Sequence, residues 1–245
     1  MKIKDILLEI EVNEWRDCFL RSIPNIKNWF KKWFEEAKID FLTESVLPIF
    51  IDDKGNIFKE NSVIFENISK KFLTREPNHV KKDELMSIGK WKTPRQEQNL
   101  NENTEELIRE VSQEVMNTLD DKKKMFILVK GIDNNKNKKL KGIGVAVASA
   151  ILTVLYPDRF CVIDYRAKRA LCILKKKGEL ESYDTLSFRS YQDFLKTYEI
   201  IINTSDISLY FKYLEIIKDI CGVIGPNITP RMLEVALWKY DKNKD

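Results

Sequence analysis

The chain has 245 residues, of which 43% are hydrophobic and 33% charged, and its formal net charge is +4. These proportions are typical of a soluble globular protein that is long enough to bury a core. No apolar run approaches the roughly 20 residues that a membrane-spanning helix needs, and acids interrupt the amino-terminal segment too early for a signal peptide. We therefore expect no membrane association and a cytoplasmic location.

Cysteine and histidine are too few and too scattered for most metal and cofactor chemistry. The cysteines are Cys18, Cys161, Cys172 and Cys221, with no CxxC spacing among them. This scatter argues against an iron–sulfur cluster, structural zinc and disulfides. The single histidine, His79, lies in a polar stretch that we expect to be a surface loop. We expect neither a metal nor a cofactor.

The first half of the chain is predicted to be helical apart from one hairpin. Apolar residues at three- and four-residue steps predict helices over 5–20, 25–37, 83–90 and 105–119. Two β-branched and aromatic runs around "DDKG" predict a small β-hairpin within 46–65. Asn103 or Thr104 is suited to begin the helix that follows, which has two acids in its first turn.

Most of the second half of the chain is also predicted to be helical. The expected helices cover 145–156, 165–176, 190–203, 206–222 and 229–240. Pro157 closes the first of these helices, and Gly178 is expected to lie just beyond the second. Thr229 and Pro230 suit the cap and the first residue of the last helix. A mostly α-helical protein follows from these patterns.

The most basic part of the chain is residues 122–141, which hold eight lysines and one acid, Asp133. Clustered cations bind the phosphate backbone of nucleic acids irrespective of base sequence, because binding releases counterions. A solvated run of charge in a lysine-rich protein is an equally good interpretation of this segment alone. Its position directly before a pair of glycines favours nucleic-acid binding.

That glycine pair lies in "LKGIG", residues 140–144, which we interpret as a tight turn between two helices. Glycine permits positive φ and close approach of a ligand to the backbone. The backbone N–H groups of Gly142 and Gly144, with the positive end of the next helix, are suited to hold an anion. Lys139 and Lys141 lie beside the turn. The pattern predicts a helix-hairpin-helix motif that contacts the DNA backbone.

Asp164 begins another helical pattern, "VIDYRAKRAL", at residues 162–171. Aspartate is a preferred helix cap, so capping alone is a sufficient explanation of this residue. A carboxylate at a helix start is also suited to catalysis, because the helix dipole favours its ionised form. Both roles are compatible, and the sequence leaves them open.

Together the two stretches resemble the helix-hairpin-helix DNA glycosylases of the endonuclease III superfamily. Asp164 follows Gly144 by twenty residues and precedes Arg169 by five, which is similar to the superfamily's spacing of hairpin, acid and arginine. The motif "DYRxxR" is especially similar to the corresponding motif of the archaeal 8-oxoguanine glycosylases. The resemblance implies that Asp164 is the catalytic acid and that the hairpin binds DNA, with Arg169 as a further backbone contact.

The resemblance extends to "EVALW" near the carboxyl terminus, where Glu234 and Trp238 have the separation of residues that hold the flipped base in the archaeal enzymes. One departure concerns mechanism. Bifunctional members have a nucleophilic lysine two residues after the second hairpin glycine, and this chain has Ala146 there. The resemblance therefore implies a monofunctional enzyme that releases the base and leaves an abasic site, without lyase activity.

Residues 89–96, "GKWKTPRQ", form another candidate contact. Trp91 or Gln96 is suited to enter the gap that a flipped base leaves, and Trp91 is also a candidate for the base pocket. A capping turn with Trp91 packed inward is the competing interpretation.

The expected architecture has two helical lobes, one formed by 85–165 with the hairpin and one by 1–84 plus 166–245. We expect a monomer that acts on double-stranded DNA containing a damaged or modified base, in DNA repair. The alternatives are a non-catalytic helix-hairpin-helix DNA-binding protein and a glycine turn that only packs helices. The identity of the base does not follow from the sequence.

Overall fold

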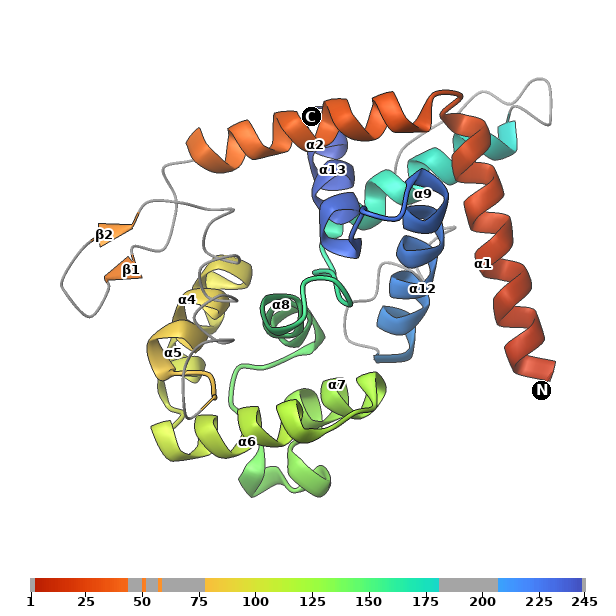
Figure 1. Cartoon of the computed structure of the whole chain (residues 1–245). Coiled ribbons are helices and arrows are strands. Elements are labelled where there is room, and N and C mark those ends of the chain that lie inside the picture. Colours follow the sequence, from red (N-terminus) through yellow and green to blue (C-terminus); the bar gives the residue numbers. More distant parts are fainter. Residues whose placement is uncertain (1–2, 44–49, 52–56, 59–77, 181–206, 244–245) are drawn as a thin grey trace. The chain divides into compact units, whose positions relative to one another are not determined.

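The computed structural model describes residues 3–43, 50–51, 57–58, 78–180 and 207–243 (Figure 1). The described part is mostly helical, as expected. The predicted helix over 190–203 lies outside the described residues. No described helix is long and apolar enough to cross a membrane.

The chain divides into two compact units. Unit 1 comprises residues Met1–Ala37 and Ile163–Asp245, and unit 2 comprises Lys38–Val162. The expected lobes had boundaries at 84/85 and 165/166. In the structure the boundaries fall between Ala37 and Lys38 and between Val162 and Ile163, so that the candidate acid Asp164 and the glycine turn belong to different units.

Among the described residues, unit 1 contains α1 (Ile3–Ser22), the part of α2 (Ile26–Thr43) up to Ala37, α9 (Tyr165–Leu180), α12 (Ile207–Ile224) and α13 (Pro230–Lys242). Helix α9 packs against both α1 and α13, and α12 packs against α1 and α13. The cap of α13 is as predicted, because the Thr229 hydroxyl accepts the N–H of Met232 at 3.3 Å and Pro230 is the first helical residue.

Gly178 does not end α9 as predicted, because the helix continues to Leu180. A methyl group at Gly178 would clash with the backbone of Cys18 in α1. The Arg21 side chain of α1 also donates to the Gly178 carbonyl oxygen at 3.3 Å. Glycine is therefore needed here for the close approach of two helices rather than for a turn.

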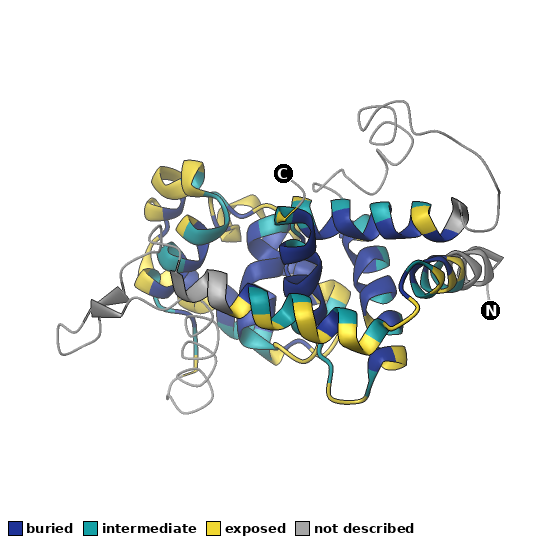
Figure 2. Cartoon of the chain, turned by 90° about the horizontal axis from the view of Figure 1, so that it is seen from above, coloured by how far each residue is buried: buried dark blue, intermediate teal, exposed yellow. Residues whose placement is uncertain are grey.

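Unit 2 contains a small antiparallel pair, β1 (Phe50–Ile51) and β2 (Ile57–Phe58), within the range predicted for a hairpin. Its other elements are α4 (Lys82–Lys92), η1 (Pro94–Gln96), α5 (Glu97–Asn101), α6 (Glu105–Asn117), α7 (Asp121–Lys130), η2 (Ile132–Asn134), η3 (Lys136–Lys138) and α8 (Val145–Leu155). Helix α8 packs against α4 and α7 (Figure 1). Its small residues Ala148, Ser149 and Ala150 are fully buried, which lets these neighbours approach closely. Several helices of the chain show buried residues in dark blue and exposed residues in yellow along their length (Figure 2).

The four cysteines are all buried thiols. Burial raises the pKa of Cys172 and Cys221 from the ordinary 9.0 to about 12, although the charges of Lys168 and Lys175 partly offset this at Cys172. The folded protein therefore keeps both protons at pH values where the unfolded chain loses them. The stability that this contributes is complete below about pH 9 and is lost as the pH rises toward 12.

We expect both buried thiols to resist alkylation in the native protein at pH 8, because the neutral thiol is a poor nucleophile and each side chain is enclosed. Iodoacetamide labelling with and without urea, read by peptide mass spectrometry, measures this. Equal labelling rates in the two conditions would contradict the burial of these residues.

Candidate functional site

The turn before α8 has the conformation that the glycine pattern predicts. Gly142 has a φ of +75°, in the region that favours glycine. Leu140 and Ile143 are 2% and 4% exposed and anchor the turn in the core of unit 2. Gly144 is the N-cap residue of α8. The backbone N–H groups of the first turn of α8 therefore follow directly on an exposed glycine.

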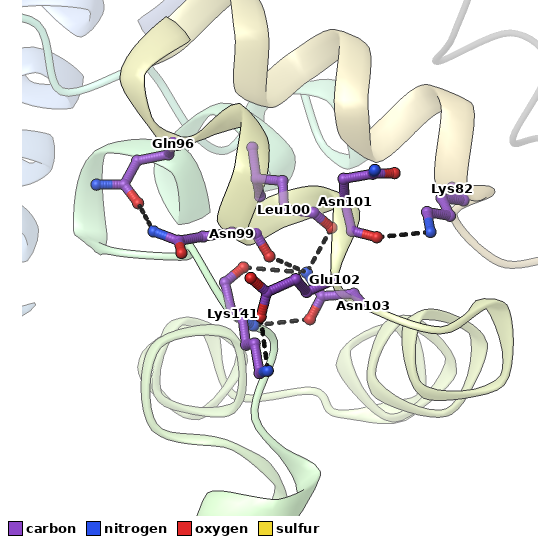
Figure 3. Close-up of polar contacts among 8 residues, drawn as sticks. All are labelled: Lys82, Gln96, Asn99, Leu100, Asn101, Glu102, Asn103 and Lys141. Atoms are coloured by element: carbon purple, nitrogen blue, oxygen red, sulfur yellow. Dashed lines mark hydrogen bonds and ion pairs between the residues drawn. The ribbon is translucent and has the colours of Figure 1, made fainter.

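Asn103 fixes this turn from the other side, across 38 residues of sequence (Figure 3). Its side-chain oxygen accepts the Lys141 N–H at 2.7 Å, and its Nδ2 donates to the Lys141 carbonyl oxygen at 3.1 Å. Nδ2 also donates to the Leu100 carbonyl oxygen at 2.8 Å. Asn103 was a candidate helix cap, but the cap of α6 is Thr104, whose hydroxyl accepts the Leu107 N–H. No local sequence pattern predicts that the Asn103 side chain would bind the backbone of a turn so distant in the sequence.

Leu100 of α5 fills the space between α4 and the turn. A methyl group at Gly89 of α4 would clash with Leu100, and one at Gly142 would lie 3.1 Å from its Cγ. Leu100 is itself fully buried. The turn is thus held by one buried amide and one buried leucine, both from the α5–α6 region.

The fold does not require glycine at the second position of the pair, Gly144. Gly144 has a φ of −101° and a ψ of −178°, an extended conformation open to any residue. A methyl group there would meet no described atom within 4 Å. The residue is exposed. Neither the backbone conformation nor the packing therefore requires glycine at this position, and its effect is to leave space in front of the N-terminus of α8.

The two glycines yield a paired prediction. Gly142→Ala is expected to lower the free energy of unfolding by about 1–2 kcal/mol, because alanine disfavours positive φ and the new methyl group would press on Leu100. Gly144→Ala is expected to change stability by less than about 0.5 kcal/mol. Urea unfolding of both variants measures the difference. Equal destabilisation by the two substitutions would contradict the geometry of this turn.

The hairpin lacks a regular first helix. Helix α7 ends at Lys130, and only two single 3₁₀ turns, η2 and η3, separate it from Leu140. The segment "DNNKNKK" contains poor helix formers, and Asp133 and Asn134 have φ values of 52° and 60°. A helix-hairpin-helix with two α-helices is thus not what residues 131–145 form. The turn and its second helix are present.

The lysines of 122–141 do not act as one solvated cluster. Lys124 is 2% exposed, donates to the Val115 carbonyl oxygen at 2.8 Å and lies 4.5 Å from the centroid of the Tyr156 ring. Lys138 pairs with Glu110 at 2.6 Å, and the hydrogen bond and charge of Glu110 raise the pKa of Lys138. The predicted charge of this segment is therefore partly neutralised.

The two lysines predicted to contact DNA flank the turn as expected. Lys141 is 62% exposed at its side chain and forms an ion pair with Glu102 at 2.7 Å. Such an exposed pair is weak and can be exchanged for a phosphate at little cost. Lys139 is exposed and has no ion-pair partner among the residues that the structure describes.

Asp164 caps α9 in unit 1. Its Oδ1 accepts the backbone N–H of Arg166 at 2.9 Å, and its carbonyl oxygen accepts the N–H of Lys168 at 3.1 Å. The residue is partly buried. The capping role that the sequence left open is therefore present. It fixes the carboxylate at the positive end of a long helix.

Arg169, which was predicted to contact a DNA phosphate, binds the carboxylate of Asp241 within unit 1. Its Nε lies 2.5 Å from Oδ1 of Asp241 in α13, and its Nη2 contacts Oδ2 of the same residue. Asp241 is fully buried, and the Arg169 side chain is only 13% exposed. A guanidinium that is hydrogen-bonded to one oxygen of a buried carboxylate and ion-paired with it is costly to release.

The predicted base-pocket residues Glu234 and Trp238 share a face of α13 with Asp241, because their spacings of four and seven residues are helical. Asp241 is bound to α9 within two turns of Asp164. Trp238 is partly exposed, and Lys242 lies 5.0 Å from the centroid of its ring. Glu234 is 3% exposed and forms an ion pair with Arg231.

Trp91 lies in unit 2, in the last turn of α4, and is partly exposed rather than packed wholly inward. Gln96 ends η1, and its side-chain oxygen accepts from Asn99 at 2.7 Å.

The candidate chemistry thus lies in two groups of residues. The turn with Lys139 and Lys141 belongs to unit 2, and Asp164 with Glu234 and Trp238 belongs to unit 1. Comparison of the chain with protein-family models, with curated proteins and with solved structures found no match.

Proposed function

We propose that this protein is a DNA glycosylase that hydrolyses the N-glycosidic bond of a damaged or modified base flipped out of double-stranded DNA. The observation that carries the proposal is Asp164, a partly buried carboxylate fixed at the start of α9 by the Arg166 N–H. The proposal takes the protein to be a cytoplasmic monomer that serves base excision repair.

The chemistry needs one well-placed carboxylate. Positive charge develops on the sugar as the bond between C1′ and the base nitrogen breaks. A carboxylate beside that carbon stabilises the charge and orients or deprotonates the attacking water. The bond from the Arg166 N–H holds Oδ1 of Asp164 in one position, so that little reorganisation is needed as charge develops.

The turn before α8 supplies the DNA-backbone contact in this proposal. Lys139 and Lys141 are exposed beside it, and the positive end of α8 attracts anions. The open space at Gly144 suits the approach of a phosphate to the backbone N–H groups.

A target base must leave the duplex stack before it can react, and it needs a surface to rest on. Trp238 is the proposed platform, and the Glu234 carboxylate is proposed to accept a hydrogen bond from a base edge. Trp91 is proposed to fill the gap in the duplex. Ala146, in the first turn of α8, supplies no amine nucleophile, so the resemblance to the glycosylases implies base release without strand cleavage.

Incubation of the protein with duplexes that each contain one lesion, followed by alkali on half of each sample, tests the proposal. Strand breaks only after alkali are expected, because alkali cleaves the abasic site that a monofunctional enzyme leaves. Breaks without alkali would contradict the inference from Ala146. No break on any substrate would leave the second candidate below.

A non-catalytic DNA-binding protein is the second candidate. It is favoured by the bond from the Arg166 N–H, which gives Asp164 a complete structural role as a helix cap. This candidate shares the predicted phosphate contacts and differs only in the chemistry.

A further inference from the structure

The solvent face of α7 combines cations with an exposed aromatic ring. Phe126 is 51% exposed, an unusual position for a phenylalanine. Lys123 precedes it by three residues and Lys130 follows it by four, and both are exposed. These spacings place all three side chains on one face of the helix. The opposite face carries buried residues, among them Met125 and Leu128.

The charge of this face is not neutralised within the described part of the chain. Neither Lys123 nor Lys130 has an ion-pair partner among the described residues. The two acids at the start of α7 are otherwise engaged, because Asp120 accepts the Lys123 backbone N–H at 2.7 Å and Asp121 pairs with Arg159 at 2.5 Å. The face is therefore a cationic strip with a phenyl ring at its centre.

The strip continues toward the turn before α8. Gly131, which follows Lys130, lies against the η3 segment, since a methyl group on it would stand 2.9 Å from the Lys138 carbonyl oxygen and 3.0 Å from Cβ of Lys139. Lys139 is the exposed cation that flanks the turn. The end of α7 and the proposed DNA-backbone contact are thus neighbours within unit 2.

We propose that the Lys123–Phe126–Lys130 face of α7 binds an unpaired stretch of a DNA strand, with its phosphates on the lysines and one base stacked on Phe126. This inference rests on the proposed function to the extent that both require DNA at the turn before α8. It adds a second contact and names the form of DNA that the contact takes.

The chemistry of the face selects this occupant. Acidic groups complement the lysines, and the bases of a nucleic acid add flat aromatic surfaces that stack on an exposed phenyl ring, as in proteins that bind single strands. Base pairs within a duplex hide their faces in the stack, so the ring requires an unpaired base. Lys123 and Lys130 lie about 10 Å apart along the helix, the length of about three stacked nucleotides.

Fluorescence anisotropy with two DNAs tests the proposal: a fully paired duplex, and the same duplex with a three-nucleotide single-stranded gap. Phe126→Ala is expected to weaken binding of the gapped DNA about tenfold and that of the paired duplex by less than twofold. Phe126→Trp is expected to restore the affinity. Lys123→Gln/Lys130→Gln is expected to lower the salt dependence of gapped-DNA binding by about 1.4 in log–log slope.

Lys27→Gln/Lys31→Gln provides the control, because it also removes two exposed lysines from one face of a helix, here one turn apart on α2 in unit 1. Polyglutamate offers negative charge without bases. An equal loss on both DNAs with Phe126→Ala, or no loss on either, would overturn the proposal while base release by the wild-type protein still supported the proposed function. Phe126-dependent binding of polyglutamate without an effect on gapped DNA would instead identify an acidic protein partner. Failure of the wild-type protein to bind either DNA would overturn both proposals.

Discussion

Asp164→Asn is expected to reduce base release about 1,000-fold while DNA affinity stays within about twofold. Asparagine caps a helix as well as aspartate does, so the bond from the Arg166 N–H and the start of α9 should persist. What the substitution removes is the negative charge that stabilises the developing positive charge on the sugar. Single-turnover release from the best lesion substrate, scored after alkali, measures the effect, and anisotropy measures affinity.

Asp120→Asn is the matched control for this substitution. Asp120 caps α7 in the same way, accepting the N–H of Lys123 at 2.7 Å, and has no proposed part in the chemistry. We expect its base release to equal that of the wild-type protein. Undiminished release by Asp164→Asn would reduce Asp164 to a helix cap and place the reaction elsewhere.

Local features of the fold follow from the sequence because their causes lie within a few residues. At the start of α13 the Thr229 hydroxyl accepts the N–H of Met232, and Pro230 has no N–H that needs a partner. The positive φ of Gly142 follows similarly from a tight turn between apolar anchors. Asp164 was recognisable as a helix start for the same reason.

The features of the structure that could not be predicted from the sequence depend on contacts between residues that are far apart in the chain. Arg169 looked like a surface cation until the fold placed Asp241, 72 residues away, against it. Asn103 and Lys141 are 38 residues apart, and Gly178 is set by the backbone of Cys18 in another helix. A lysine run also looks uniform in sequence, whereas burial of Lys124 and the acids on neighbouring helices divide it. Such choices depend on tertiary context, which overrides local propensity.

Asp241→Asn is expected to lower the free energy of unfolding of the protein by about 3 kcal/mol. Asp241 is fully buried and is held by Arg169 in α9, with Arg166 at 3.7 Å. Removal of one partner from a buried ion pair leaves the other charge without compensation in a site that excludes water, which typically costs about 3–5 kcal/mol. Urea unfolding followed by circular dichroism measures the change in midpoint.

Asp17→Asn supplies the comparison, because Asp17 pairs with Arg16 at 2.9 Å but is 51% exposed at its side chain. An exposed pair contributes about 0–1 kcal/mol, so this variant should unfold close to the wild-type midpoint. Arg169→Met/Asp241→Leu removes both charges together and should recover much of the loss, since an apolar pair of similar volume needs no compensation. If Asp241→Asn lowered the free energy of unfolding as little as Asp17→Asn does, α9 and α13 would be held together by apolar packing alone. The charge of Asp241 would then have no part in holding α9, the helix that Asp164 caps.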